Sequence, residues 1–552
     1  MKKARRVVAG VCLLAATIAA GRERAEQGDA KKGTKPDLAL TAVGRQHHAI
    51  ATKNREAQEY FDQGMTFVFG FNHEEAASAF QAAAELDPAS PMPLWGIALA
   101  VGPNYNMDVD PEREKLAFET IQKAQKLAEH APQIEKDYVA ALAARYSGEA
   151  KPDFAKLART YARAMRELSQ KYPDDLDAAT IYADSLMVLH PWQLWSLDGK
   201  PGEDTEEIIR VLESVLARNP NHAGANHYYI HAVEASPHPE RALASAARLE
   251  TLVPQAGHLV HMPAHIYVRT GDYAAAARSN EISAERDRVY AEKANKQGSL
   301  YDLMYHSHNE HFRAYAAAME GRYAEAKAAA DALAARLAPH AKMMPMLDPF
   351  LMTPIWVDAR FGRWEELLAW PEPAKELPCT HAFWHYGRGL AYFMRGDATT
   401  GAVELDAMLA ETAKIPADAP FGTLNLVKNV YRLAAHVLAA RRVTAEGKKD
   451  EIAMRWERAV ALQDALNYDE PPDWYYPVRE SLGAALLTAG RAADAEKVFR
   501  EDLAKNPRNP RSLFGLAESL KAQKRDADAA WVEREFKEAW KNADTQLRLS
   551  DL

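Results

Sequence analysis

Histidines recur at regular intervals in the middle of the chain. The segment Asn-His-Tyr-Tyr-Ile-His-Ala-Val-Glu places His227 and His231 four residues apart, with Glu234 three residues later. On a helix, side chains at these spacings lie along one face. His261 and His265 repeat the four-residue spacing. The interval from His227 to His261 is 34 residues, and so is the interval from His231 to His265. Two imidazoles at i and i+4, completed by ligands from another element, are a recurrent way of binding zinc, iron or copper.

The histidine pattern extends into a further unit of sequence. His308 and His311 stand 13 and 10 residues before Gly321, and two earlier histidines stand at the same distances before Gly271. Three successive helices should therefore project imidazoles from one face. The metal would be zinc, copper, iron or manganese, with Glu234 as a carboxylate ligand or a base. The predicted metal-binding residues are His227, His231, Glu234, His258, His261, His265, His308 and His311.

The same residues allow two other interpretations. The imidazoles could form a hydrogen-bonding surface for a peptide or an anionic ligand, or they could have a purely structural role. A single histidine on a helix is most often a hydrogen-bonded core or surface residue. A shared site is favoured only because seven histidines recur at matching positions of successive units. Further residues are predicted to line the groove beside the histidines, namely Asn226, Arg269, Asn309 and Tyr315.

A repeating pattern of small and large residues indicates the elements that position these side chains. In the stretch 56–88, Tyr60, Gly64, Phe67, Phe71, Ala76, Phe80, Ala83 and Pro88 stand where two antiparallel helices would interlock. The pattern returns near the other end as Leu482, Gly483, Gly490, Ala495, Phe499 and Pro507. This arrangement resembles a tetratricopeptide repeat, whose unit length of 34 residues matches the histidine interval. The resemblance implies that the first helix of each unit lines a concave groove.

The resemblance predicts an all-α protein, a right-handed α-solenoid of helix-turn-helix units. Divergent repeats should fill residues 54–440, and more regular ones residues 441–545. Two segments, 189–204 and 283–305, interrupt the regular period and are expected to be insertions. The first could fold over the groove as an aromatic lid or pack against a neighbouring repeat. Such a fold serves many partners, so it indicates architecture better than function.

The N-terminus has the layout of a secretory signal peptide. Basic residues are followed by a 14-residue apolar run, 7–20, which ends in small residues and is too short to span a bilayer. We expect residues 1–21 to be a signal peptide, residues 22–53 a flexible tether, and the mature chain to be periplasmic or secreted, without a membrane span. Removal of the signal would leave Cys379 as the lone cysteine, so no internal disulfide is expected.

Composition and missing motifs narrow the function. The 552 residues are 48% hydrophobic and 26% charged with a net charge of −9, which predicts a folded protein and disfavours nucleic acid as a partner. The phosphate-binding loop, Gly-x-Ser-x-Gly, His-Glu-x-x-His and Cys-x-x-Cys are all absent. We therefore expect a binding or scaffold module with a protein or peptide partner. A metal-dependent enzyme using the histidines and Glu234 is the first alternative, and metal storage or delivery is the second.

Overall fold

Helices dominate the described part of the chain. The computed structural model describes residues 46–108 and 110–552, so the predicted signal peptide and most of the predicted tether lie outside it. Strand pairing among these residues is confined to a short antiparallel hairpin, β1 (Pro420–Phe421) with β2 (Asn425–Leu426), and two isolated bridges. The predicted all-α solenoid of helix-turn-helix units is confirmed. Within the described ranges, no helix combines the length and apolar character needed to cross a membrane.

The described residues form two compact units. Unit 1 contains residues 46–266 and 285–297, and unit 2 contains residues 267–284 and 298–552. The boundary predicted at residue 441 separates divergent repeats from regular ones and does not concern compact units. It therefore stays a prediction. In unit 1 the elements are α2 (Arg55–Phe69), α3 (His73–Leu86), α4 (Met92–Val101), α5 (Pro111–Ala128), α6 (Gln133–Ala143), α7 (Phe154–Lys171), α8 (Leu176–Met187), α9 (Thr205–Arg218), α10 (Ala223–Val233), η1 (Pro239–Ala242), α11 (Leu243–Leu252) and α12 (Gly257–His261).

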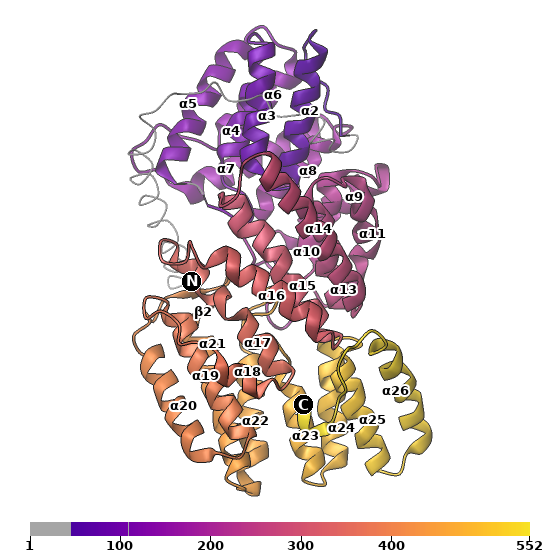
Figure 1. Cartoon of the computed structure of the whole chain (residues 1–552). Coiled ribbons are helices and arrows are strands. Elements are labelled where there is room, and N and C mark those ends of the chain that lie inside the picture. Colours follow the sequence, from indigo (N-terminus) through magenta and orange to yellow (C-terminus); the bar gives the residue numbers. More distant parts are fainter. Residues whose placement is uncertain (1–45, 109) are drawn as a thin grey trace. The chain divides into compact units, whose positions relative to one another are not determined.

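Two helices contribute residues to both units, α13 (Pro263–Thr270) and α14 (Tyr273–Lys293). Unit 2 continues with the π-helix η2 (Asp302–His306), α15 (Ser307–Met319), α16 (Tyr323–Leu337), η3 (Pro345–Met352), α17 (Thr353–Arg360), α18 (Trp364–Ala369), α19 (Pro378–Met394), α20 (Ala398–Thr412), α21 (Val427–Ala445), α22 (Lys449–Gln463), α23 (Val478–Thr488), α24 (Ala492–Lys505), α25 (Pro510–Ala522), α26 (Asp526–Ala539) and η4 (Leu549–Asp551). Within each unit, successive helices pack against one another as hairpins (Figure 1).

Glycines opposite aromatic rings set the spacing within these hairpins. A Cβ atom at Gly64 of α2 would lie 2.5 Å from Cε1 of Phe80 on α3. In unit 2, a Cβ atom at Gly483 of α23 would lie 2.4 Å from Cζ of Phe499 on α24. Any larger residue would force the ring or the helix to move, because both phenylalanines are fully buried. The interlocking of small and large residues predicted from the two repeat copies is confirmed.

The predicted turn glycines end the first helices of their hairpins. Gly271 has a φ of +82° and Gly321 a φ of +80°, a region that L side chains rarely adopt. After Gly321, the amide of Arg322 donates to the carbonyl of Ala317 at 3.0 Å, which closes the helix end. After Gly271, the carboxylate of Asp272 accepts from the amide of Ala275 at 3.0 Å and starts the next helix.

The two predicted insertions adopt different structures. Residues 188–204 form an irregular loop between α8 and α9. This loop packs on unit 1, since the indole of Trp195 donates to the carbonyl of Ala232 at 2.8 Å and Thr205 Oγ1 donates to the carbonyl of Leu194 at 2.7 Å. The charged segment 283–305 is mostly helical, because α14 continues to Lys293 and η2 follows.

Candidate metal centre

Helix α10 carries the first histidine pair inside the core of unit 1. All eleven of its residues are buried, which is unusual for a helix containing two imidazoles. His227 and His231 lie on one face with ring centroids 4.9 Å apart. The predicted i, i+4 arrangement is therefore present, and both rings are no more than 3% exposed.

The second group of histidines comes from α12 and the start of α13. The sequence His-Met-Pro-Ala-His breaks the helix at Pro263, which lacks the amide needed to continue it. Across this break, Nε2 of His261 lies 2.8 Å from Nε2 of His265. His258, one turn earlier, places its ring centroid 5.7 Å from that of His261. All three side chains are buried.

The two groups meet at His227 and His258, whose Nε2 atoms are 3.2 Å apart. Nδ1 of His227 donates to the carbonyl of Phe69 at 2.6 Å. This bond fixes the tautomer of His227 and leaves a lone pair on its Nε2. When a carbonyl accepts from one ring nitrogen of a histidine, the other ring nitrogen is unprotonated and its lone pair can coordinate a metal.

Glu234 links the histidines of the two repeats. Its Oε1 accepts from Nδ1 of His231 at 2.9 Å, and its Oε2 lies 2.6 Å from Nδ1 of His265. Glu234 caps the end of α10 and is almost fully buried. Because both oxygens face histidine nitrogens, this carboxylate is placed to orient two imidazoles. The predicted role of Glu234 as a metal ligand or a base stays a prediction.

The Nε2 atom of His231 is the group that these contacts leave unsatisfied. It is buried and has no hydrogen-bond partner among residues 46–108 and 110–552. One ring nitrogen from each of His227, His231 and His258 lies within 4.8 Å of the other two. Three imidazole nitrogens thus converge in the core of unit 1.

Aromatic rings enclose this convergence. Phe71 stacks on His231 and on His258 with centroids 5.8 and 5.7 Å away, and its φ of +56° is uncommon for a bulky residue. Tyr105 and Trp192 cover His231 from another direction, with centroids 5.4 and 5.8 Å away. The enclosed imidazoles are buried, so polar interactions among them are strengthened.

Burial and charge set the protonation of the cluster. Burial lowers the pKa of His227 far below its usual value, and the nearby His231 lowers it further. Burial also lowers the pKa of His231, against the opposing effect of Glu234. Burial alone would raise the pKa of Glu234, but His265 and His231 outweigh it and lower it to about 2. The neutral imidazole of His231 therefore lies beside the ionised carboxylate of Glu234.

The last two predicted ligands belong to unit 2. His308 contacts Phe312 edge to face, with ring centroids 5.3 Å apart. His311 stacks on Tyr475 with centroids 5.3 Å apart, and burial lowers the pKa of His311 to about 3. Within unit 2, both rings pack against aromatic side chains.

The predicted groove residues are largely buried. The amide of Asn226 donates to the carbonyls of Pro220 and His222 at 2.8 and 2.9 Å, bonds that fix the start of α10. In unit 2, the amide of Asn309 donates to Ser283 Oγ at 2.6 Å. Tyr315 contacts Tyr475, and the guanidinium of Arg269 lies 5.5 Å from the ring of Tyr468. Ligand binding by Asn226, Arg269, Asn309 and Tyr315 stays a prediction.

A triad of one carboxylate and two imidazoles in unit 1 was not evident in the sequence. The carboxylate of Asp177 lies 2.8 Å from Nδ1 of His48 and 3.0 Å from Nε2 of His222. Nδ1 of His222 accepts from the amide of Ala225, which caps α10. The triad therefore anchors the helix that carries His227 and His231. Its members come from three distant segments, so no local spacing reveals them.

Comparison with known proteins gives structural neighbours alone. No protein-family model and no curated protein matches the chain. The human IFIT1 dimer with PPP-AAAA is 12% identical, with 88% of this chain and 91% of that chain covered at a TM-score of 0.30. The P58(IPK) TPR domain is 13% identical, with 89% and 94% covered at 0.20, and yeast Tom70 is 12% identical, with 87% and 90% covered at 0.29. At these TM-scores the likeness carries no argument about ligand or activity.

The chain's own structure defines its class. Each unit is an array of helical hairpins, with Gly64 against Phe80 in unit 1 and Gly483 against Phe499 in unit 2. Unit 1 differs from a plain repeat array because a buried histidine cluster replaces part of its apolar core.

Proposed function

We propose that this protein is a metal-binding helical-repeat protein in which His227, His231 and His258 hold one transition-metal ion. The observation that carries the proposal is the buried Nε2 of His231, which has no hydrogen-bond partner in the described part of the chain. Zinc to nitrogen bonds of about 2.0–2.1 Å place neighbouring nitrogens of a tetrahedral site roughly 3.4 Å apart. The 3.2 Å between Nε2 of His227 and Nε2 of His258 is already close to that separation.

Hydrogen bonding alone accounts for part of the cluster. One imidazole could donate to the other between His227 and His258, and likewise between His261 and His265. Such bonds would still leave Nε2 of His231 desolvated and unpaired, at a cost of about 1–3 kcal/mol. An ion shared by three nitrogens removes that cost. Metal binding is therefore the function that this geometry supports best.

The donor set narrows the choice of ion. Imidazole nitrogen suits zinc, copper, iron and nickel, whereas manganese favours oxygen donors. Glu234 faces histidine nitrogens with both oxygens, so the three-nitrogen set offers no oxygen from this residue. Of the four ions expected from the sequence, we favour zinc or copper.

We also propose that the repeat array binds a protein or peptide partner, with the metal site stabilising unit 1. Helical-repeat arrays expose extended surfaces that suit such partners.

The N-terminal sequence supports export to the periplasm or the exterior. N-terminal sequencing of the protein isolated from its native host tests export, with the first residue expected after position 21.

A metal-dependent enzyme is the second candidate, favoured by the number of converging nitrogens. Catalytic zinc sites use three protein ligands and keep one position for water or substrate, whereas structural sites use four. His227, His231 and His258 supply three nitrogens within 4.8 Å of one another. Substitution of cobalt for the native ion tests this candidate through its visible spectrum. A change on adding azide would indicate an exchangeable position, and an unchanged spectrum would exclude a catalytic site.

The primary test is elemental analysis of untagged protein purified without chelators. We expect near-stoichiometric zinc or copper in the parent and loss of the metal in His231→Ala. His238→Ala is the matched control, because His238 is an exposed histidine of unit 1, and it should retain the metal. The absence of metal in the parent after reconstitution, or a full equivalent in a folded His231→Ala variant, would refute the proposal.

A further inference from the structure

The segment that follows α26 returns along unit 2 and contacts several of its hairpins. The ring of Trp540 packs over Gly321, where a Cβ atom would lie 2.4 Å from Cη2 of the indole. The carboxylate of Asp544 accepts from the amides of Tyr323 and Ala324 at 2.7 and 2.9 Å, which caps the start of α16. Residues 540–545 form a turn that is held on elements more than 200 positions away in sequence.

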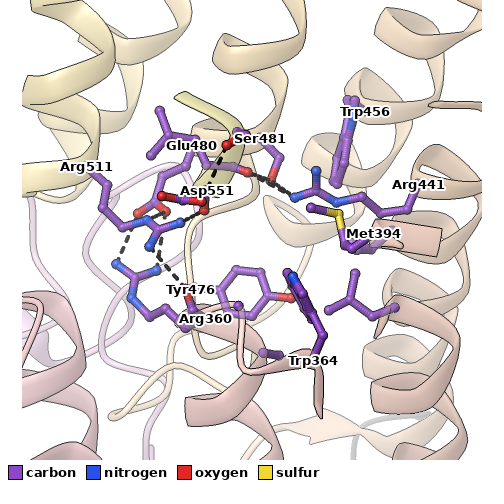
Figure 2. Close-up of a pocket in the computed structure, with 16 residues that line it drawn as sticks. Arg360, Trp364, Met394, Arg441, Trp456, Tyr476, Glu480, Ser481, Arg511 and Asp551 are labelled. Atoms are coloured by element: carbon purple, nitrogen blue, oxygen red, sulfur yellow. Dashed lines mark hydrogen bonds and ion pairs between the residues drawn. The ribbon is translucent and has the colours of Figure 1, made fainter. Parts of the chain in front are cut away.

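The last residues of this segment enter a hollow between α17, α21, α23 and α25. Figure 2 shows Arg441, Ser481 and Arg511 converging on them. The main-chain oxygen of Leu552 accepts from Nη2 of Arg441 at 2.9 Å and from Oγ of Ser481 at 3.0 Å. The guanidinium of Arg511 donates to the carbonyl of Asp551. Leu552 is 2% exposed, so its side chain is buried in the hollow.

Part of the hollow is fixed without this segment. Glu480 lies 3.3 Å from Arg360 and 2.8 Å from Arg511, and all three side chains are buried. Arg511 also donates to the carbonyl of Arg360 at 3.1 Å. These contacts hold the guanidinium of Arg511 in place before any peptide binds, which reduces the entropy lost on binding.

Arg441 differs from the other arginines of the hollow. Its guanidinium lies over the ring of Trp456 at 4.8 Å, and no carboxylate side chain in residues 46–108 and 110–552 forms an ion pair with it. Its Nε is buried without a hydrogen-bond partner in the same residues. Its hydrogen-bond acceptors are Ser481 Oγ and the main-chain oxygen of Leu552. The hollow therefore has donor capacity that a different occupant could use.

We propose that this hollow is a peptide-binding site of unit 2 and that residues 548–552 are its resident occupant, displaced by a partner segment of the same chemistry. That segment presents a buried leucine-sized side chain next to an acidic residue, with main-chain oxygens facing Arg441, Ser481 and Arg511. The proposal is independent of the histidine cluster, which lies in unit 1. If residues 548–552 had a purely structural role, they would make the same contacts but a free peptide would not displace them.

The first experiment uses a chain truncated after Gln546, which keeps Asp544 and Thr545. A fluorescein-labelled peptide of residues 546–552 is titrated with the truncated and the full chain, and its anisotropy is measured. We expect binding to the truncated chain at least about tenfold tighter than to the full chain, whose own segment competes. Circular dichroism establishes that the truncated chain keeps its helices. A folded truncated chain that fails to bind the peptide overturns the proposal.

Two substitutions in the truncated chain identify the site. Arg441→Gln removes the guanidinium that faces the peptide oxygen and should weaken binding about tenfold or more. Arg442→Gln is the matched control, because Arg442 pairs with Glu446 on the surface of the same helix, and it should leave binding unchanged. Equal effects of the two substitutions would place the peptide elsewhere and refute the assignment.

A second measurement keeps the full chain and does not depend on the truncated form folding. Ser550 is exposed, so Ser550→Cys can carry an environment-sensitive fluorophore, whereas Cys379 is buried. Unlabelled peptide should change the fluorescence in a saturable way as it displaces the resident segment. Fluorescence that stays constant up to about 1 mM peptide would show that the peptide does not displace the resident segment, and it would overturn the proposal.

Discussion

Nδ1 of His265 lies 2.6 Å from Oε2 of Glu234, and this contact joins two successive repeats of unit 1. The other oxygen of Glu234 accepts from Nδ1 of His231, so one carboxylate sets the ring orientation in both repeats. A buried carboxylate between two imidazoles is expensive unless each of its oxygens is paired. The arrangement therefore explains why an ionised group is tolerated in this core.

Glu234→Gln should weaken metal binding by about 10- to 100-fold, because an orienting carboxylate raises the basicity of the histidine it holds. The glutamine keeps the size of the side chain but has one acceptor oxygen for two imidazoles. Competition with a metal-indicator dye measures the affinity. Glu240→Gln is the control, since Glu240 pairs with the exposed His238, and it should have no effect. Unchanged affinity in Glu234→Gln would contradict the orienting role.

Trp192→Ala should speed release of the bound metal. The indole covers His231 with ring centroids 5.8 Å apart, and its removal opens a path for water and chelator. The rate of metal transfer to excess chelator, followed by stopped flow, should rise about tenfold, while the affinity changes little because no ligand is lost. Trp531→Ala removes an exposed indole and should leave the rate unchanged. Identical release rates in the parent and Trp192→Ala would show that the indole does not gate the site.

The sequence predicted the local geometry of the cluster better than its surroundings. Helical spacing placed His227 and His231 on one face, and the 34-residue interval related them to the next repeat. The residues that complete the environment are far away in sequence. The carbonyl of Phe69 precedes its partner His227 by 158 positions, and Phe71 stacks on the rings from a turn that nothing in the histidine pattern indicates.

His308 and His311 lie in unit 2, whereas the other predicted ligands lie in unit 1, so counting from turn glycines related residues of two compact units. The predicted role of His308 and His311 as metal ligands stays a prediction.

Gly64→Ala should destabilise unit 1 through overpacking. The added Cβ would lie 2.5 Å from the ring of Phe80, and the buried ring has little room to move. We expect the free energy of unfolding to fall by about 1–3 kcal/mol, measured by urea denaturation. Gly389→Ala is the control, because its nearest neighbour would be 3.4 Å away and alanine favours the helix. A Gly64→Ala variant as stable as the parent would show that the hairpin can widen at little cost.

Asp502 should make the stability of unit 2 depend on pH. Burial and the nearby Glu480 raise its pKa from 3.8 to about 6. Between these two values the folded chain holds a proton that the unfolded chain has released, so stability falls as the pH rises from about 4 to 6. A shift of about two units corresponds to roughly 3 kcal/mol.

Asp502→Asn should remove this contribution. The amide stays uncharged, so the change in the free energy of unfolding between about pH 4 and pH 6 should be smaller in the variant than in the parent. The comparison uses the slope with pH, because the amide also disturbs the hydrogen bonds that Asn506, Asn509 and Ser512 donate to Asp502 and lowers stability at every pH. Parallel pH profiles for parent and variant would show that Asp502 is ionised in the folded chain across this range.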